Sequence, residues 1–236
     1  MKRLVFLLAI MFCGVAFAQT IRWHIGDTVY QTTTCNAGES ITPPTAPEKF
    51  GYSFREWAEY SPIEYLDISQ GSFITVKYSF NIRCIFETKL SILANMVKDN
   101  GLFGNDWKQQ SLLVVFDNNN KFLSYFSAGS GVENTKIITK DTPYILTVGN
   151  GFIIVDDFTV IGTPLNSLSV STLRIPYSRV SGTFRLFYFK IYDNDILVRD
   201  FIPILDKNGT PCMYDKVEGK FYYNAGTGQF IAGPVI

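Results

Sequence analysis

Aromatic and acidic residues near the C-terminus of this 236-residue chain have the types and spacing that suit sugar recognition. Tyr214 directly precedes Asp215, and Tyr222 lies between Phe221 and Tyr223. Aromatic rings present flat apolar faces for stacking, and carboxylates accept strong hydrogen bonds from hydroxyl groups. Tyr214, Asp215 and Tyr222 are therefore the candidate ligand-binding residues, with a glycan as the candidate ligand. The alternative is structural, because an Asp beside a glycine-containing turn often accepts hydrogen bonds from backbone N–H groups.

A second charged pair, Arg199 and Asp200, follows the apolar residues Leu197 and Val198 and precedes Phe201. These two side chains either belong to a binding site or form internal contacts that fix the ends of strands. An unpaired charge is costly to bury, so the sequence favours an internal ion pair or turn contact.

Acidic segments raise the question of a metal. Calcium takes six or more oxygen ligands, mostly carboxylates and carbonyls. Some of these could come from Asp156-Asp157, Asp193-Asn194-Asp195 or Asp206-Lys207-Asn208, but none of the three has the pattern of an EF-hand loop. We therefore predict no cofactor, and calcium stays open without a specific motif. Zinc is not expected, because the cysteines form no C-x-x-C pair.

Catalytic patterns are not found in the sequence. The chain has one histidine, His24, and neither a G-x-S-x-G elbow nor a G-x-x-x-x-G-K phosphate loop. A glycosidase needs two facing carboxylates, which on one strand face means a spacing of two or four residues. Glu64 and Asp67 are three residues apart, and an expected hairpin turn separates Asp193 from Asp195. We predict that the protein is not an enzyme.

The composition and the N-terminus indicate an exported protein without a nucleic-acid partner. Lys plus Arg and Asp plus Glu number 21 each, so no net positive charge attracts a phosphate backbone. Lys2 and Arg3 precede the apolar run 4–17, which ends in the cleavage pattern Ala16-Phe17-Ala18. Residues 1–18 are therefore predicted to be a signal peptide. The run is too short to span a bilayer comfortably, so we expect a secreted, cell-surface or periplasmic protein with no membrane span after cleavage.

The predicted mature chain keeps three cysteines, Cys35, Cys84 and Cys212. Because three is an odd number, at most one intramolecular disulfide can form. A Cys35–Cys84 or a Cys84–Cys212 bridge is compatible with an oxidising compartment. The alternative is that all three are buried and behave as small apolar residues.

The elements that would position these residues are predicted to be strands. Apolar and polar residues alternate at period two, and Asn, Asp and Gly interrupt the pattern every eight to twelve residues. Only residues 90–97 are compatible with a short helical turn. The pattern predicts an all-β fold with a two-sheet sandwich. Asn194-Asp195 is expected to form a type I′ hairpin turn, and Phe187, Phe189 and Ile191 to share one strand face.

The N-terminal part of the mature chain resembles the Listeria–Bacteroides repeat, also called the internalin B-repeat. The resemblance rests on Ala37-Gly38-Glu39, Pro44, Pro47 and Gly51-Tyr52-x-Phe54-x-x-Trp57. One departure is Glu56, where the family usually has Gly. The resemblance implies a small β-grasp-like module of a bacterial surface or secreted protein, which we place with its linker at residues 19–79.

The remaining residues, 80–236, resemble the LamG-like, concanavalin-type jelly rolls of exported bacterial proteins. The motifs that carry this resemblance are Phe184–Asp193, Leu197–Pro203, Tyr214–Val217, Gly219–Asn224 and Gly226–Gly233. The resemblance implies a non-catalytic binding or adhesion role, with a glycan or a surface protein as partner. The alternative is a structural component of a cell-envelope or appendage assembly, and a glycoside-active enzyme is a less favoured third possibility.

Overall fold

The protein is described from a computed structural model, and its chain divides into two compact units, residues 1–57 and 58–236. The structure describes residues 19–25, 28–36, 39–48, 59–93, 100–105, 112–117, 119–125, 131–177 and 183–236. The predicted signal peptide, residues 1–18, lies outside these ranges.

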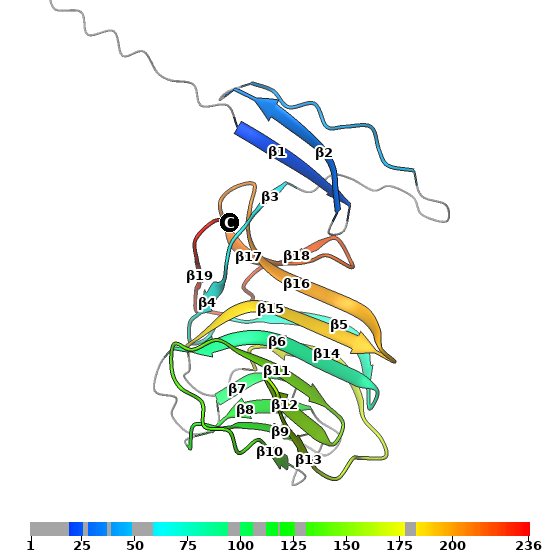
Figure 1. Ribbon diagram of the computed structural model, residues 1–236, viewed down its shortest axis with the longest axis vertical. Helices are drawn as coiled ribbons and strands as arrows, with labels where there is room; N and C mark the ends of the chain where they lie inside the picture. The colour runs from blue at the N-terminus through cyan, green and yellow to red at the C-terminus, as the bar shows by residue number, and fades with distance from the viewer. Residues whose placement is uncertain are drawn as a thin grey trace, which may run out of the picture. The chain divides into compact units, whose positions relative to one another are not determined.

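The described part of the first unit contains an antiparallel hairpin of β1 (Gln19–Ile25) and β2 (Thr28–Cys35) (Figure 1). The indole N–H of Trp23 donates a hydrogen bond of 2.9 Å to the hydroxyl of Thr33 on the facing strand. This bond joins the two strands near their middle.

The residues that distinguish the expected β-grasp-like module lie mostly outside the described ranges. This holds for Ala37, Gly38 and the whole segment 49–58, which includes Tyr52, Phe54 and Trp57. The resemblance to the Listeria–Bacteroides repeat therefore stays a prediction.

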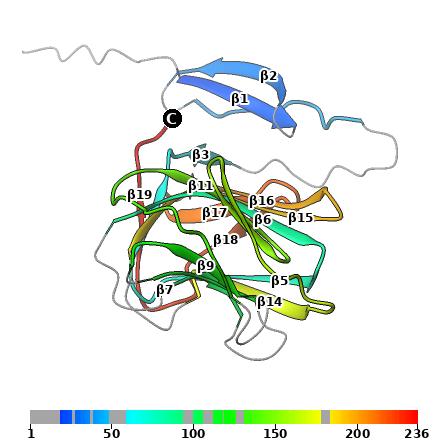
Figure 2. The same ribbon diagram turned by 60° about the horizontal axis from the view of Figure 1, so that its bottom comes forward.

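The second unit is built from two antiparallel sheets, which Figure 2 shows as two layers, with β6, β15 and β16 in one and β5, β7 and β14 in the other. The larger sheet has the strand order β13-β12-β11-β6-β15-β16-β17-β18, and β3, β4 and β19 join it at its side. Its strands are β3 (Tyr60–Pro62), β4 (Leu66–Ile68), β6 (Cys84–Ile92), β11 (Tyr144–Gly149), β12 (Phe152–Val155), β13 (Phe158–Ile161), β15 (Phe184–Asp193), β16 (Ile196–Asp206), β17 (Pro211–Asp215), β18 (Lys220–Tyr222) and β19 (Phe230–Ala232).

The smaller sheet has the order β10-β9-β8-β7-β14-β5. Its strands are β5 (Ile74–Asn81), β7 (Asn100–Gly104), β8 (Leu113–Phe116), β9 (Phe122–Tyr125), β10 (Gly131–Glu133) and β14 (Ser169–Ile175). The predicted all-β sandwich is confirmed. The described residues form no helix, and residues 90–92, which we expected in a helical turn, belong to β6.

The division between the two units lies earlier than expected. Residues 60–79, assigned from sequence to the first module and its linker, supply β3, β4 and part of β5 of the sandwich. Pro62 pairs with Ile204 of β16, and Ile68 pairs with Phe184 of β15. These partners are far apart in the chain, so a local pattern does not reveal the pairing.

Phenylalanine side chains fill the space between the two sheets. Phe80 and Phe103 come from the smaller sheet, and Phe86, Phe189 and Phe201 come from the larger one. The rings of Phe103 and Phe189 meet edge to face, with centroids 5.0 Å apart. All five side chains are fully buried. Burial of each contributes about 1.5–3 kcal/mol to stability, and the five rings belong to one continuous core between the layers.

A β-bulge overturns one expectation about β15. The register shifts between Leu186 and Tyr188, so Phe187 is an extra residue in its strand. As a result Leu186, Phe189 and Ile191 are buried in the core, whereas Phe187 contacts Tyr65 and Lys89 instead. Phe187 therefore does not share a face with Phe189 and Ile191, as strict alternation had predicted.

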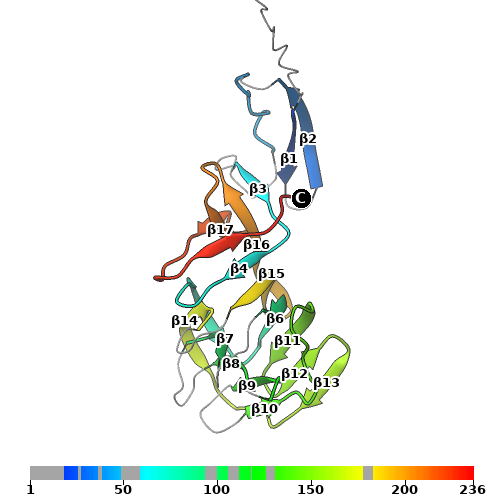
Figure 3. The same ribbon diagram turned by 90° about the vertical axis from the view of Figure 1, so that its left-hand side faces the viewer.

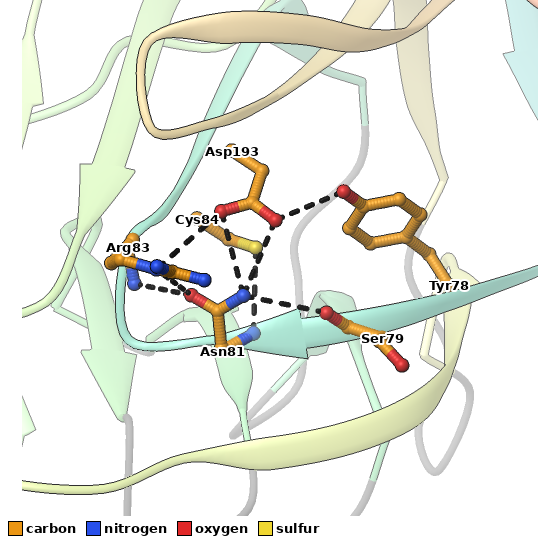
Figure 4. A network of polar contacts seen from close by, with 6 residues as sticks. All are labelled: Tyr78, Ser79, Asn81, Arg83, Cys84 and Asp193. Atoms are coloured by element: carbon orange, nitrogen blue, oxygen red, sulfur yellow. Dashed lines mark hydrogen bonds and ion pairs between the residues drawn. The ribbon is translucent and has the colours of Figure 1, made fainter.

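The hairpin turn between β15 and β16 has the expected type I′ geometry. Asn194 and Asp195 both have positive φ, 49° and 62°. The neighbouring Asp193 accepts a hydrogen bond of 2.9 Å from the hydroxyl of Tyr78 and one of 3.3 Å from the amide of Asn81 (Figure 4). Since Tyr78 and Asn81 belong to β5, these bonds tie the hairpin of the larger sheet to the smaller sheet.

The C-terminal segment is fastened to the beginning of the second unit (Figure 3). The side chain of Asn224 accepts a hydrogen bond of 3.0 Å from the backbone N–H of Phe73 and one of 2.9 Å from that of Gly226. Gly226 lies so close to Gly71 that a Cβ atom would overlap the Gly71 carbonyl oxygen. This close approach leads β19 to its position beside β4.

We predict that Gly226→Ala lowers the free energy of unfolding by about 1–3 kcal/mol, because the added methyl group forces two backbone segments apart. Gly209→Ala is the comparison, since no atom lies within 4 Å of the place that its new methyl group would occupy and only its positive φ of 77° opposes the change. That variant should lose about 1 kcal/mol. Urea denaturation of both variants measures the difference, and equal losses would contradict the close contact.

Candidate functional site

Four aromatic side chains form a continuous row on the second unit: Tyr60, Tyr214, Phe221 and Tyr223, here called the aromatic row. The ring centroids of Tyr60 and Tyr214 are 4.8 Å apart, and those of Tyr214 and Phe221 are 5.1 Å apart. Phe221 and Tyr223 stack with centroids 6.4 Å apart. The row crosses β3, β17 and β18 and ends just beyond β18.

The aromatic row lies on the face of the sheet that points away from the core. Tyr214 pairs directly with Phe221, and the next pair, Met213 and Tyr222, packs toward the core instead. Successive residues of a strand point to opposite faces, so Tyr214 and Phe221 share the outer face. Tyr223 is 47% exposed, and the other three rings are half-buried.

One end of the aromatic row carries a carboxylate. The hydroxyl of Tyr223 donates a hydrogen bond of 2.9 Å to Asp206 Oδ2. Asp206 Oδ1 accepts bonds of 2.8 Å from the backbone N–H groups of Asn208 and Thr210. The bond from Thr210 is the largest of the effects that lower the pKa of Asp206. Loss of hydration and the bond to Asp206 raise the pKa of Tyr223 to about 12, so at neutral pH the row ends in a carboxylate beside a neutral phenol.

Of the three residues predicted from sequence, only Tyr214 lies in the aromatic row. Tyr222 packs edge to face on Phe201, with centroids 5.1 Å apart, and its hydroxyl donates a hydrogen bond of 2.7 Å to Glu218. Tyr222 therefore lies on the core face of β18, whereas Phe221, the partner of Tyr214, lies on the outer face. The structure does not bring Tyr214 and Tyr222 together as one site.

Asp215 has the structural role that was the alternative prediction. Its side chain is fully buried, and Oδ1 accepts hydrogen bonds of 3.0 Å from the backbone N–H groups of Asp200 and Val217. A carboxylate without exposed surface does not reach a ligand on the outer face. Asp215 instead holds β17 against β16 at the turn that leads into β18.

The sequence prediction missed three members of the aromatic row, Tyr60, Phe221 and Tyr223. Tyr223 follows Phe221 by two residues, so the period-two rule places both on one face and could have identified it. Tyr60 joins the row only because β3 pairs with β16, where Tyr60 lies opposite Asp206. No local signal in the sequence indicates that long-range pairing.

A charged cluster, formed by the buried Arg199 and Asp215 and the exposed Glu218, lies on the core side of the same strands. Arg199 Nε is 3.4 Å from Asp215 Oδ2, and Arg199 Nη2 is 2.5 Å from Glu218 Oε1. The guanidinium also lies over the ring of Tyr78 on β5, 5.2 Å from its centroid. The predicted internal ion pair of Arg199 is confirmed, and the neighbouring Asp200 pairs separately, with Lys216 at 3.3 Å.

Burial raises the pKa of Asp215, although its backbone hydrogen bonds and Arg199 act in the opposite direction. The ionised carboxylate is therefore costly to hold in this place. Its charge is compensated by the backbone N–H groups of Asp200 and Val217 and by Arg199, whose side chain is itself only 11% exposed. Each of these two charges is tolerated inside the sandwich because the other is present.

The acidic segments considered for calcium are engaged in contacts within the protein. Asp156 binds Lys136 Nζ at 2.7 Å and the N–H of Ile145 at 2.9 Å. Asp193 belongs to the network in Figure 4, and Asp206 to the end of the aromatic row. Among the described residues, no group of three His, Cys, Asp or Glu side chains could hold a metal ion.

The structure shows that Cys84 forms no disulfide bridge. Cys84 and Cys212 are free and fully buried, so neither bridge that involves Cys84 is formed. Burial raises the pKa of both thiols, that of Cys212 to about 12. Both therefore stay protonated at neutral pH and pack as small apolar side chains.

Comparison with known proteins adds no relative. No family model matches the chain, and no curated protein matches it. Within the described ranges, no helix combines the length and the apolar character that a membrane crossing requires. The candidate site is therefore judged on its own geometry.

We predict that Arg199→Met lowers the free energy of unfolding by about 3–5 kcal/mol at neutral pH, because it leaves Asp215 buried without its counter-ion. The folded pKa of Asp215 is already above its unfolded value of about 3.9 and rises further in the variant. The loss should therefore be smallest below the unfolded pKa and grow as the pH rises through the folded pKa.

Denaturant titrations between acid and neutral pH measure this dependence. The matched control is Arg185→Met, which breaks a more exposed ion pair with Asp67 and should cost about 1 kcal/mol. Arg199→Met combined with Asp215→Asn removes both charges and should recover part of the loss at neutral pH. A loss in Arg199→Met that does not change with pH would exclude an uncompensated Asp215 as its cause.

Proposed function

We propose that the protein is an exported bacterial binding protein, secreted or held at the cell surface, which recognises a glycan through the aromatic row without catalysing a reaction. One observation carries the proposal: Tyr60, Tyr214, Phe221 and Tyr223 are in contact across three strands on the outer face. The exposed ring of Tyr223 is hydrogen-bonded to Asp206.

The chemistry of the aromatic row suits a sugar chain. The apolar faces of successive pyranose rings stack on aromatic side chains, and their hydroxyl groups need acceptors and donors nearby. Asp206 is an ionised acceptor, and Tyr223 is a neutral hydroxyl beside it. The sheet holds the rings in place, so little side-chain entropy is lost when a ligand binds.

The titration behaviour of these groups supports a binding role over an enzymatic one. An acid–base catalyst works best when its pKa is near the operating pH. The pKa of Asp206 is lowered and that of Tyr223 is raised to about 12, so both are moved away from neutrality. Neither group is adjusted for proton transfer.

Two further features support export. The sequence 1–18 has the pattern of a signal peptide. The free thiols of Cys84 and Cys212 are fully buried, which protects them from oxidation outside the cytoplasm.

The balanced charge of the chain supports a partner other than nucleic acid.

A role in envelope or appendage assembly is the second candidate, and a different surface favours it. The outer face of β11, β12 and β13 carries Ile145, Phe152, Ile154 and Ile161 and no charged residue. Ile145 is 42% exposed and Ile161 is 80% exposed. Exposed apolar surface of this kind is typical of contacts between protein subunits.

A glycan array probed with the mature chain, with and without calcium, tests the proposed function. We expect binding that Tyr223→Ala weakens at least tenfold, about 1.4 kcal/mol, because the most exposed ring of the row is lost. Phe158→Ala is the matched control, since Phe158 is 44% exposed on β13, outside the row. Tyr222→Phe should bind normally, because Tyr222 faces the core side.

If the chain binds no glycan on a broad array, a glycan is rejected as the ligand. Glycan binding that survives Tyr223→Ala and Tyr214→Ala together would reject the aromatic row as its site. Sedimentation analysis then distinguishes the second candidate, for which the chain should self-associate and Ile161→Lys should abolish the association.

A further inference from the structure

Three Asn-Gly pairs occur in the chain, and the structure holds them in different ways: Asn100-Gly101, Asn150-Gly151 and Asn208-Gly209. In such a pair the backbone nitrogen of the glycine can attack the carboxamide carbon of the asparagine. Glycine permits this approach because it has no Cβ and a flexible backbone. The reaction also requires that the asparagine side chain rotates freely.

Asn208-Gly209 meets these requirements. It lies in the turn between β16 and β17, where residues 207–210 are all exposed. Gly209 has a φ of 77°, and no atom lies within 4 Å of the place where a Cβ would be. The backbone N–H of Asn208 is bonded to Asp206, and Asn208 is an exposed residue.

Asn150-Gly151 is an internal control with the same chemistry and a different environment. The carboxamide of Asn150 donates a hydrogen bond of 2.9 Å to the Leu165 carbonyl and accepts one of 2.8 Å from the Leu165 N–H. Gly151 also packs closely against Pro164, since a Cβ at Gly151 would lie 2.9 Å from the proline backbone. Both ends of the amide are held, so the side chain does not reach the Gly151 nitrogen.

The third pair is held by the sheet. Asn100 pairs with Phe116, and Gly101 pairs with Val115 of β8. A Cβ at Gly101 would overlap the carbonyl oxygen of Tyr177, so the backbone there has no room to move. Of the three pairs, Asn208-Gly209 therefore combines an exposed asparagine with open space around the glycine, and the hydrogen bond of 2.8 Å from the Gly209 N–H to the Asp206 carbonyl must open before the nitrogen reacts.

We propose that Asn208 is a site of spontaneous deamidation, which converts this turn into an aspartate or isoaspartate form as the protein ages. The Gly209 nitrogen loses its proton and forms a bond to Asn208 Cγ, the Cγ–Nδ2 bond breaks, and ammonia leaves. Water then opens the resulting succinimide at either carbonyl. The net reaction consumes one water and releases ammonia, with no oxidation or reduction.

The product acts on the end of the aromatic row. Asp206 receives three hydrogen bonds from this turn, two at Oδ1 from Asn208 and Thr210 and one at its carbonyl from Gly209, at 2.8 Å each. An isoaspartate lengthens the main chain by one carbon and breaks this arrangement. Asp206 then no longer holds Tyr223 in place, so the modification alters the exposed end of the row.

Peptide mapping by mass spectrometry tests the proposal on the full chain, incubated natively in mildly alkaline buffer. We expect Asn208 to convert with time, with isoaspartate detected by isoaspartyl methyltransferase labelling, while Asn150 stays an amide. In the chain unfolded by denaturant, both should convert at similar rates. Asn208→Ser should show no new acidic species at this turn.

A native Asn208 that stays intact while the unfolded chain reacts would overturn the proposal, as would equal conversion of Asn150 in the native protein. The effect on the turn has its own readout. The isoaspartate form, separated by ion exchange, should melt at a lower temperature than Asn208→Asp, which adds the charge without lengthening the backbone. Equal melting temperatures would show that the turn and Tyr223 are undisturbed. None of these outcomes depends on the identity of the ligand.

Discussion

The second unit depends on the contact between its two sheets, each of which has one apolar face that must leave water. Five phenylalanines make this contact, with Phe86 touching Phe80, Phe103 and Phe189. The strands that supply them lie at the centre of the larger sheet and on either side of β14 in the smaller one. Because the apolar faces turn inward, alternation of side chains leaves the outer face of the same strands available for other roles.

The two faces of β17 differ clearly in the side chains that they carry. Met213 and Asp215 serve the interior, one in the core and the other in the charged cluster, while Tyr214 between them belongs to the aromatic row. Arg199 of β16 contacts both sheets, because its guanidinium pairs with Asp215 of β17 and lies over the ring of Tyr78 of β5. The residues that stabilise the core and the residue proposed to bind a ligand are thus neighbours on one strand that point to opposite faces, so changes to the row need not disturb the core.

Local sequence patterns correctly predicted those structural features that are determined by residues close together in the chain. The all-β class, the type I′ turn at Asn194-Asp195 and the internal ion pair of Arg199 follow from alternation, turn chemistry and the cost of burying charge. The bulge at Phe187 did not follow, because one extra residue in a strand reverses the faces after it. Tyr60 and the short strands β3 and β4 were missed for another reason: their partners, such as Ile204 and Phe184, are more than a hundred residues away.

The pairing of β4 with β19 also bears on when the second unit can form. Ser69 and Gln229 are hydrogen-bonded across 160 positions of sequence, so β4, the second strand of the unit, meets the last strand only after nearly the whole chain is present. Contacts of such long range make folding slow. A chain whose last strand pairs late stays unfolded for longer during synthesis, and an unfolded chain is what the proposed export through a narrow channel would require.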